Sequence, residues 1–345
     1  MNPPVSENIT IRLMEVCGTH TMAIAQSGLK QLLPRGIQLI SGPGCPVCVT
    51  PPEAVDLAVE LSLRPGVTVC TYGDMLRVPG SSRNTSLLKA RGRGASVEMV
   101  FSPIDALELA RQNPAQEFVF LGVGFETTAP GTLAAVKTAR EQQLANFSVL
   151  MLLRLVEPAL RTLLEDPENR IDGFLCPGHV AVITGEEGFR FLPEEYGLPA
   201  VIGGFETGEL VGALKKLIRQ VQARDPRLVN AYPRLVRPEG NRMAREIIRE
   251  MTRPAPALWR GLGKIENSAL ELKEAYAPWD AALKYGLTLP EVSAPSACRC
   301  GQVISGRISP EECPFFGKGC TPDDPLGPCM VSSEGSCAAA YQFGG

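Results

Sequence analysis

Short apolar runs alternate with longer stretches of helical period between residues 9 and about 221, and this alternation constrains the fold more than any other feature. The runs that have the length and composition of buried strands lie at residues 9–16, 37–40, 67–70, 97–101, 118–123, 148–153, 173–176 and 200–202. The stretches of helical period lie at about residues 20–33, 52–63, 103–112, 129–144, 156–165 and 206–223. Elements in this order predict an α/β fold with parallel sheets.

Two similar segments divide this region into halves. FLGVGFETT at residues 120–128 and VIGGFETGE at residues 201–209 both read as a strand, a glycine-rich turn and the start of a helix. Either an internal repeat or convergence of glycine-rich turns explains the similarity. Segments near residues 112–116 and 225–239 interrupt the regular elements and are the expected joints between domains. We therefore expect one α/β domain at residues 9–114, a second, similar α/β domain at 115–235 and a small Cys-rich domain at 236–345.

The C-terminal segment lacks the apolar periodicity of a conventional core. After residue 293 it is rich in Gly, Pro and Cys, and six of the chain's eleven cysteines lie in the last 48 residues. A metal is expected to organise such a segment. Cys298, Cys313, Cys320 and Cys337 have the spacing C-x14-C-x6-C-x16-C, which matches neither a ferredoxin nor a zinc ribbon. The spacing allows either an iron–sulfur cubane or zinc as the bound group. It also does not decide which four of the six sulfurs are the ligands.

Composition excludes several classes of protein. Charged residues make up 21% of the chain and the formal net charge is -3, so neither a basic nucleic-acid binder nor a disordered chain is expected. The N-terminus has no signal-peptide core, and Arg154 interrupts the longest apolar run, so we expect a cytoplasmic protein without membrane contact. In a long chain without an export signal, cysteines are better explained as metal ligands or redox thiols than as structural disulfides.

The chemically unusual residues follow predicted strands. Ligands bind open parallel sheets at the carboxyl ends of the strands. The strand ends carry EVCGTHT, SGPGCPVCVTP, GFETT, LCPGHV and GGFE. These segments contain both histidines of the chain and four of its cysteines, namely His20, His179, Cys17, Cys45, Cys48 and Cys176. The sequence therefore predicts a functional cleft at the strand ends, although chance placement in short loops is the alternative.

Cys45 and Cys48 form a Cys-x-x-Cys pair, which can close a disulfide or place two thiolates on one metal. The sequence TPPE at residues 50–53 is typical of a helix start, and the positive end of that helix should favour the Cys48 thiolate. Without a second such pair at zinc-finger distance, structural zinc is the weaker interpretation here.

Three more strand-end residues have two interpretations each. Cys17 and His20 could form a catalytic Cys–His pair, or Cys17 could simply be packed. His179 could serve a site or merely cap a helix. Glu126 could act in acid–base chemistry or be a carboxylate that the next helix stabilises.

The motifs resemble those of the HypD family, maturation factors that help to build the iron centre of nickel–iron hydrogenases. The resemblance runs through almost the whole chain: MEVCGTHT, SGPGCPVCVTP, GFETT, CPGHV, EGN, WRGLG and the tail CxCGxV...CTPxxPxGxCMVSSEGxC. Several of these strings are long and unusual, and they stand in one fixed order, which makes the resemblance specific. One departure is GGFET at residues 203–207, where a proline is expected after the glutamate.

The resemblance implies two similar α/β domains and a domain that holds one 4Fe-4S cluster. It implies a HypC-type small chaperone and a HypE-type cyanide donor as partners, which together with this chain assemble a transient Fe(CN)2CO iron. By the same resemblance Cys17 binds that iron, aided by His179 and Glu126, and Cys45 and Cys48 are a redox dithiol. The implied cluster ligands are Cys298, Cys313, Cys320 and Cys337, and the implied second redox pair is Cys300 and Cys329.

Two other functions stay open, and the first of them would use the same cysteines. A cluster-linked thiol–disulfide reductase would pass electrons from a ferredoxin-like donor to a partner protein, and would not need Cys17 or His179. A protein with structural zinc in the tail and an ordinary ligand cleft is the other alternative. The sequence contains no Walker-type glycine loop, so nucleotide chemistry would belong to a partner. We assign no independent turnover reaction to the chain.

Overall fold

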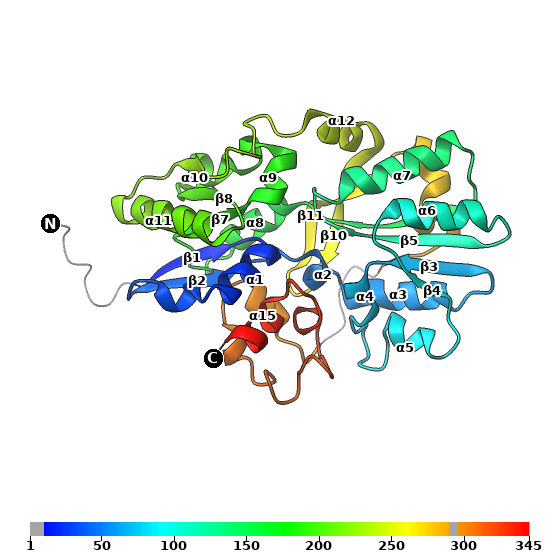
Figure 1. Cartoon of the computed structure of the whole chain (residues 1–345), viewed down its shortest axis with the longest axis horizontal. Coiled ribbons are helices and arrows are strands. Elements are labelled where there is room, and N and C mark those ends of the chain that lie inside the picture. Colours follow the sequence, from blue (N-terminus) through cyan, green and yellow to red (C-terminus); the bar gives the residue numbers. More distant parts are fainter. Residues whose placement is uncertain (1–9, 290–295, 345) are drawn as a thin grey trace.

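Parallel β-sheets occupy the two ends of the molecule, with a β-hairpin between them and a Cys-rich region along one side (Figure 1). The computed structural model describes residues 10–289 and 296–344. The expected class, α/β with two parallel sheets and a Cys-rich C-terminal region, is confirmed. All eight expected strands are present, because continuous apolar runs are typical of parallel strands that are buried on both faces.

The five-stranded sheet has the order β2-β1-β7-β8-β9, with every neighbouring pair parallel. Its strands are β1 (Ile11–Glu15), β2 (Ile37–Ser41), β7 (Gly173–Pro177), β8 (Ala200–Gly203) and β9 (Leu228–Asn230). Leu13 and the residues of its face pack against α1 (Gly18–Gln26) and α11 (Thr207–Ala223). Met14, next along β1, belongs to the opposite face, which packs against α8 (Val156–Glu165). Helices thus cover both faces, as a parallel sheet requires.

The four-stranded sheet has the order β4-β3-β5-β6 and is also parallel. Its strands are β3 (Val67–Thr71), β4 (Val97–Met99), β5 (Glu117–Gly124) and β6 (Phe147–Leu153). One face packs against α6 (Pro103–Gln112) and α7 (Ala129–Glu141). The other packs against α3 (Pro52–Ser62), α5 (Leu87–Arg91) and α13 (Ala281–Tyr285).

The strands are shared between the sheets differently from the division expected at residues 114 and 115. β1 pairs with β7, through Leu13 opposite Gly173, so the first two strands join those of the second half of the chain. The expected boundary falls between β4 and β5, inside the four-stranded sheet. Hydrophobic periodicity identifies a strand but not its partner, because pairing is decided by contacts between residues far apart in the sequence.

A β-hairpin that the sequence analysis did not anticipate lies between the sheets. β10 (Thr252–Trp259) pairs antiparallel with β11 (Gly263–Leu272), with an irregularity between Ala255 and Ala257. Two prolines in β10 give its sequence the pattern of a loop, because proline has no N–H to donate to the hydrogen bonds of a sheet. Trp259 at its end is fully buried, stacks on Phe125 and donates from Nε1 to the Ser268 hydroxyl at 2.8 Å. Trp259 also belongs to the buried cluster that contains Met14 of β1, so the hairpin contacts both sheets.

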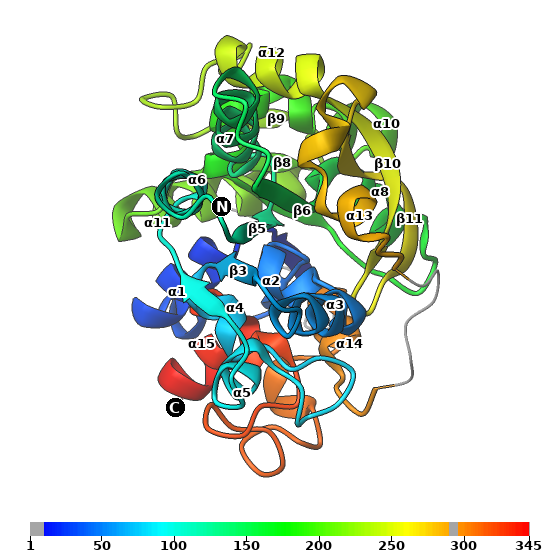
Figure 2. The same ribbon diagram turned by 90° about the vertical axis from the view of Figure 1, so that its right-hand side faces the viewer.

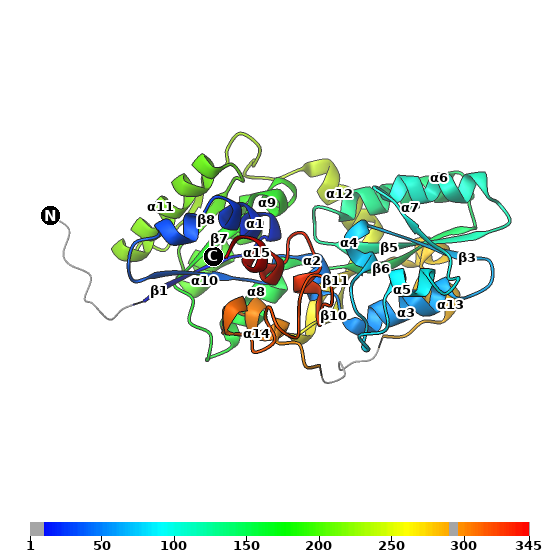
Figure 3. The same ribbon diagram turned by 60° about the horizontal axis from the view of Figure 1, so that its bottom comes forward.

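The Cys-rich region contains α14 (Cys300–Ile304), α15 (Ser336–Phe343) and two short 3-10 turns, Pro310–Glu312 and Pro328–Met330. It packs beside α1 and α2 (Pro46–Val49) (Figures 2 and 3). Gly261 in the hairpin turn and Gly301 in α14 pack backbone to backbone: a Cβ on Gly301 would lie 2.7 Å from the Gly261 Cα. The absence of two side chains therefore lets the region dock closely on the hairpin.

The remaining helical segments are short, apart from α12 near the hairpin. They are α4 (Gly73–Leu76), α9 (Gly178–Thr184), α10 (Phe191–Tyr196), α12 (Arg242–Met251), and the 3-10 segments Leu29–Leu32, Glu186–Phe189 and Glu274–Trp279. In the part of the chain that the structure describes, no helix combines the length and the apolar character needed to span a membrane.

Candidate functional site

Cys17 follows β1 and is the N-cap residue of α1, where it is 7% exposed. Desolvation raises the pKa of its thiol to about 12. A backbone hydrogen bond from His20 and a side-chain hydrogen bond with Thr19 act in the opposite direction and lower this pKa. The carboxylates of Glu334 and Glu15 raise the pKa further. A thiolate here is unfavourable alone, but a cation beside it would be attracted by all three groups.

The loop before Cys45 packs directly on Cys17. Gly18 donates its N–H to the Gly44 carbonyl at 3.0 Å, and a Cβ on Gly44 would lie only 2.2 Å from the Cys17 nitrogen. On the other side, Glu15 accepts hydrogen bonds from the Cys17 N–H at 3.2 Å and from the Thr21 hydroxyl at 2.5 Å. Burial raises the pKa of Glu15 to about 7. The structure thus brings the first two Cys-containing motifs together at the carboxyl ends of β1 and β2.

The Cys-x-x-Cys pair meets a cysteine of the C-terminal region. Cys45 accepts the Cys48 N–H at 3.2 Å and lies 3.4 Å from the Ser332 hydroxyl, while the Cys48 thiol hydrogen-bonds the sulfur of Cys329. All three cysteines are buried and free. Burial raises the pKa of Cys48 well above its ordinary value, and the neighbouring sulfurs add to the rise. The expected helix does begin at Pro52, as α3, but Cys48 lies within the four-residue α2 and the pKa of its thiol is raised, not lowered.

The tail sulfurs surround a common cavity. Its cysteines are Cys298, Cys300, Cys313, Cys320 and Cys337, and its apolar walls include Val303, Phe315, Phe316, Leu326 and Met330. A Cβ on Gly327 would lie 2.3 Å from the Cys298 sulfur, so only glycine leaves room for it. Within residues 10–289 and 296–344, no group of three or more His, Cys, Asp or Glu side chains has the arrangement of a metal-ion site. The donor set of thiols in an apolar cavity nonetheless fits an iron–sulfur cluster, and it includes the four expected ligands.

The second expected redox pair, Cys300 and Cys329, stays a prediction. Cys300 hydrogen-bonds with Cys298, whereas Cys329 hydrogen-bonds with Cys48. The two residues are near enough for their charges to interact. Cys329 therefore lies between the tail cavity and the Cys-x-x-Cys pair. Cys176, also singled out in the sequence, is fully buried in the core of β7.

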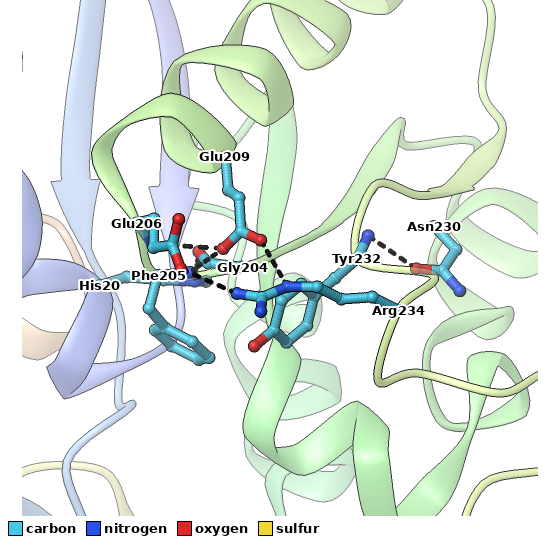
Figure 4. Close-up of polar contacts among 8 residues, drawn as sticks. All are labelled: His20, Gly204, Phe205, Glu206, Glu209, Asn230, Tyr232 and Arg234. Atoms are coloured by element: carbon cyan, nitrogen blue, oxygen red, sulfur yellow. Dashed lines mark hydrogen bonds and ion pairs between the residues drawn. The ribbon is translucent and has the colours of Figure 1, made fainter.

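The ring of Phe205 lies between the two histidines. It stacks on His179 with 3.8 Å between ring centroids and lies against His20 at 4.7 Å. His20 is fully buried and donates from Nε2 to the Gly204 carbonyl at 3.0 Å (Figure 4), and no residue of the described ranges pairs with its Nδ1. Desolvation lowers the pKa of His20 to about 4 and also lowers that of the exposed His179. Both imidazoles are therefore neutral at pH 7.

A polar network fixes the turn that carries Phe205. Glu209 accepts the Phe205 N–H at 3.0 Å, and Arg234 donates to Glu209 at 2.9 Å and to Glu206 at 3.1 Å (Figure 4). The Arg234 guanidinium also lies over the Tyr232 ring. Sequence reasoning singled out the GGFE turn but missed Phe205, because nothing in the sequence says that a turn phenylalanine meets two distant histidines.

Glu126 lies in the turn between β5 and α7 and is 6% exposed. It accepts the Val156 N–H at 2.9 Å, at the start of α8, so its partner is not the next helix as the sequence suggested. Its other oxygen has no hydrogen-bond partner among the residues described. Burial raises the pKa of Glu126 to about 7. This carboxyl group can therefore exchange a proton near neutral pH.

Glu334, which sequence reasoning missed, reaches Cys17 from the C-terminal region. It accepts a hydrogen bond from the Thr19 hydroxyl at 2.5 Å, and a Cβ on Gly18 would lie 2.5 Å from the Glu334 Cβ. Its charge opposes the lowering of the pKa of His179 by burial. The SSEG string between two cysteines was the only available signal. Three distant parts of the chain thus meet around Cys17.

Known proteins similar to this chain are described as hydrogenase maturation or formation proteins. The family model HypD, described as "Hydrogenase formation hypA family", matches residues 2–344. The hydrogenase maturation factor HypD of Rhodobacter capsulatus is 46% identical over 340 residues, which are 97% of this chain and 90% of that protein. That of Azotobacter vinelandii is 46% identical, covering 96% of this chain and 89% of its own length. That of Escherichia coli (strain K12) is 42% identical, with the same coverage of 96% and 89%.

Proposed function

This chain belongs to the HypD family of hydrogenase maturation factors, and we propose that it assembles the Fe(CN)2CO moiety of nickel–iron hydrogenase with a HypC-type chaperone and a HypE-type cyanide donor. One observation carries the proposal: Cys17 is a buried thiol at a strand end, with the carboxylates of Glu15 and Glu334 beside it. These negative charges disfavour a bare thiolate and favour a bound cation. A soft thiolate donor also suits low-spin ferrous iron with cyanide and carbonyl ligands.

The residues around Cys17 have defined tasks in this proposal. The Cys17 thiolate binds the substrate iron, while the backbone N–H of His20 holds the sulfur in place. His179, neutral and exposed, donates a hydrogen bond to a cyanide nitrogen or to the sulfur. A second thiolate from the HypC-type partner completes the site, so that exchange of the partner releases the iron.

The cavity of the tail holds the resident cofactor in this proposal. Cys298, Cys313, Cys320 and Cys337 would be ligands of one 4Fe-4S cluster, which supplies electrons when bound. The contact between Cys48 and Cys329 connects that cavity with the Cys-x-x-Cys pair. A Cys45–Cys48 disulfide that accepts two electrons and two protons becomes the dithiol seen here.

Cys17→Ala tests the function, with Cys70→Ala in β3 as the control, because both cysteines are buried and free. Each variant is purified anaerobically with the HypC-type partner, and its infrared and visible spectra are recorded. Cys17→Ala should lose the cyanide and carbonyl bands and retain the cluster absorption, whereas Cys70→Ala should keep both. Cyanide and carbonyl bands of wild-type intensity in Cys17→Ala would place the iron elsewhere.

A second candidate function is a cluster-linked thiol–disulfide reductase. The Cys48–Cys329 contact links the tail cavity to the Cys-x-x-Cys pair, as a reductase requires, and the same contact would serve either function. The two functions differ at Cys17, which a reductase does not need. Hydrogenase maturation that survives Cys17→Ala but not Cys48→Ala would favour the reductase.

A further inference from the structure

Arg260 is a buried cation in the turn between β10 and β11, and the functions described so far do not use it. It is only 4% exposed. Its backbone N–H donates to the Val49 carbonyl at 2.8 Å and its Nη1 to the Pro79 carbonyl at 3.4 Å. Among the residues that the structure describes, no carboxylate forms an ion pair with this guanidinium.

The guanidinium faces sulfur atoms instead. Arg260 lines one pocket together with Cys298 and Cys300, and its charge acts on these two sulfurs and on that of Cys329. Its Nη2 lies 4.0 Å from the Cβ position of Gly327, the glycine that makes room for the Cys298 sulfur. Arg260 therefore lies near sulfurs of the tail cavity and near Cys329, the cysteine that contacts the Cys-x-x-Cys pair.

Burial of an unpaired guanidinium is costly unless negative charge lies close by. Thiolates, and a cluster that is ligated by thiolates, supply negative charge. Reduction adds one more negative charge, so a nearby cation stabilises the reduced state more than the oxidised state. The effect is strong where water is excluded and weak for an exposed charge, which solvent and salt screen.

We propose that Arg260 is a positioning residue that raises the reduction potential of the sulfur centre in the tail cavity, by placing a buried positive charge beside Cys298, Cys300 and Cys329. The inference rests on the proposed function, since it requires the cluster in that cavity. By this proposal Arg260, which is not one of the cysteines, helps to decide how readily the sulfur centre accepts an electron.

The experiment is a redox titration of the full chain, reconstituted anaerobically and followed by electron paramagnetic resonance. Arg260→Gln removes the charge, Arg260→Lys keeps it, and Arg299→Gln removes an exposed charge between Cys298 and Cys300. We expect Arg260→Gln to favour the oxidised state at least tenfold, which is a fall of about 59 mV for one electron. Arg260→Lys and Arg299→Gln should stay near the wild-type potential.

An Arg260→Gln variant that binds four irons and titrates within error of Arg299→Gln would overturn the inference. If Arg260→Gln does not bind the cluster, Arg260→Lys decides: a wild-type potential supports a role of the charge, and a tenfold change refutes it. A wild-type chain that binds no cluster refutes the proposed cofactor together with the inference. A loaded chain whose potential does not depend on Arg260 refutes the inference alone.

Discussion

Gly44→Ala should both destabilise the protein and displace Cys17. The added Cβ would stand 2.2 Å from the Cys17 nitrogen, 2.4 Å from the Val16 carbonyl carbon and 2.6 Å from the Cys17 Cα. These are backbone atoms, which cannot rotate away as the end of a side chain can. The Gly18 N–H also donates to the Gly44 carbonyl, so the two loops must separate together.

Overpacking of this kind costs about 1 to 3 kcal/mol. Each kcal/mol lowers the melting temperature by about 2 to 4 °C in a unit of roughly 150 to 250 residues, so a fall of about 2 to 12 °C is expected. Gly212→Ala is the matched control, because nothing lies within 4 Å of its Cβ position in α11. There alanine should stabilise the helix by about 0.5 to 1 kcal/mol.

Thermal unfolding of the two variants, together with the rate at which Cys17 is alkylated, tests the reasoning. Gly44→Ala should melt lower than the wild type and alter the alkylation rate of Cys17, whereas Gly212→Ala should melt higher and leave that rate unchanged. If Gly44→Ala matches the wild type in both measurements, the close packing of the two loops is refuted.

Phe205→Ala should raise the pKa of His179 toward its ordinary value, because the ring that covers one face of the imidazole is lost; an unchanged pKa in an NMR titration would contradict this. Glu126→Gln should remove a pH dependence of stability. Because burial raises the pKa of Glu126 from 4.5 to about 7, the folded chain retains a proton that the unfolded chain releases, and stability falls as the pH rises through this range. Glutamine still accepts the Val156 N–H, so the variant should match the wild type near pH 4.5 and melt higher above pH 7; parallel pH profiles would disprove the assignment.

Local patterns in the sequence predicted most strands and helices of the two sheets. Buried parallel strands such as β6 are continuous apolar runs, and the amphipathic α11 separates its apolar and polar faces. The β10–β11 hairpin escaped because prolines interrupt its pattern. The distribution of strands between the sheets escaped for a different reason: the pairing of Leu13 with Gly173 is a contact between distant residues that no local pattern encodes.

The candidate site divides in the same way. Cys17, Cys45 and Cys48 could be placed together, because the carboxyl ends of parallel strands meet at one edge of a sheet. Phe205 and Glu334 could not, since each reaches the site from a segment more than a hundred residues away in the sequence.

The division of the strands also dictates an order of assembly. The four-stranded sheet is continuous in sequence from β3 to β6, so its strands can pair as soon as they leave the ribosome. β1 and β2 must wait for β7, and two strands alone are only marginally stable in water. The Cys17 and Cys45 loops thus remain open on an unfinished ribbon until β7 arrives, and Cys329 and Glu334 arrive later still. The thiols of Cys17, Cys45 and Cys48 are therefore open to premature oxidation or to stray metals for most of synthesis, so a reducing environment should favour correct folding.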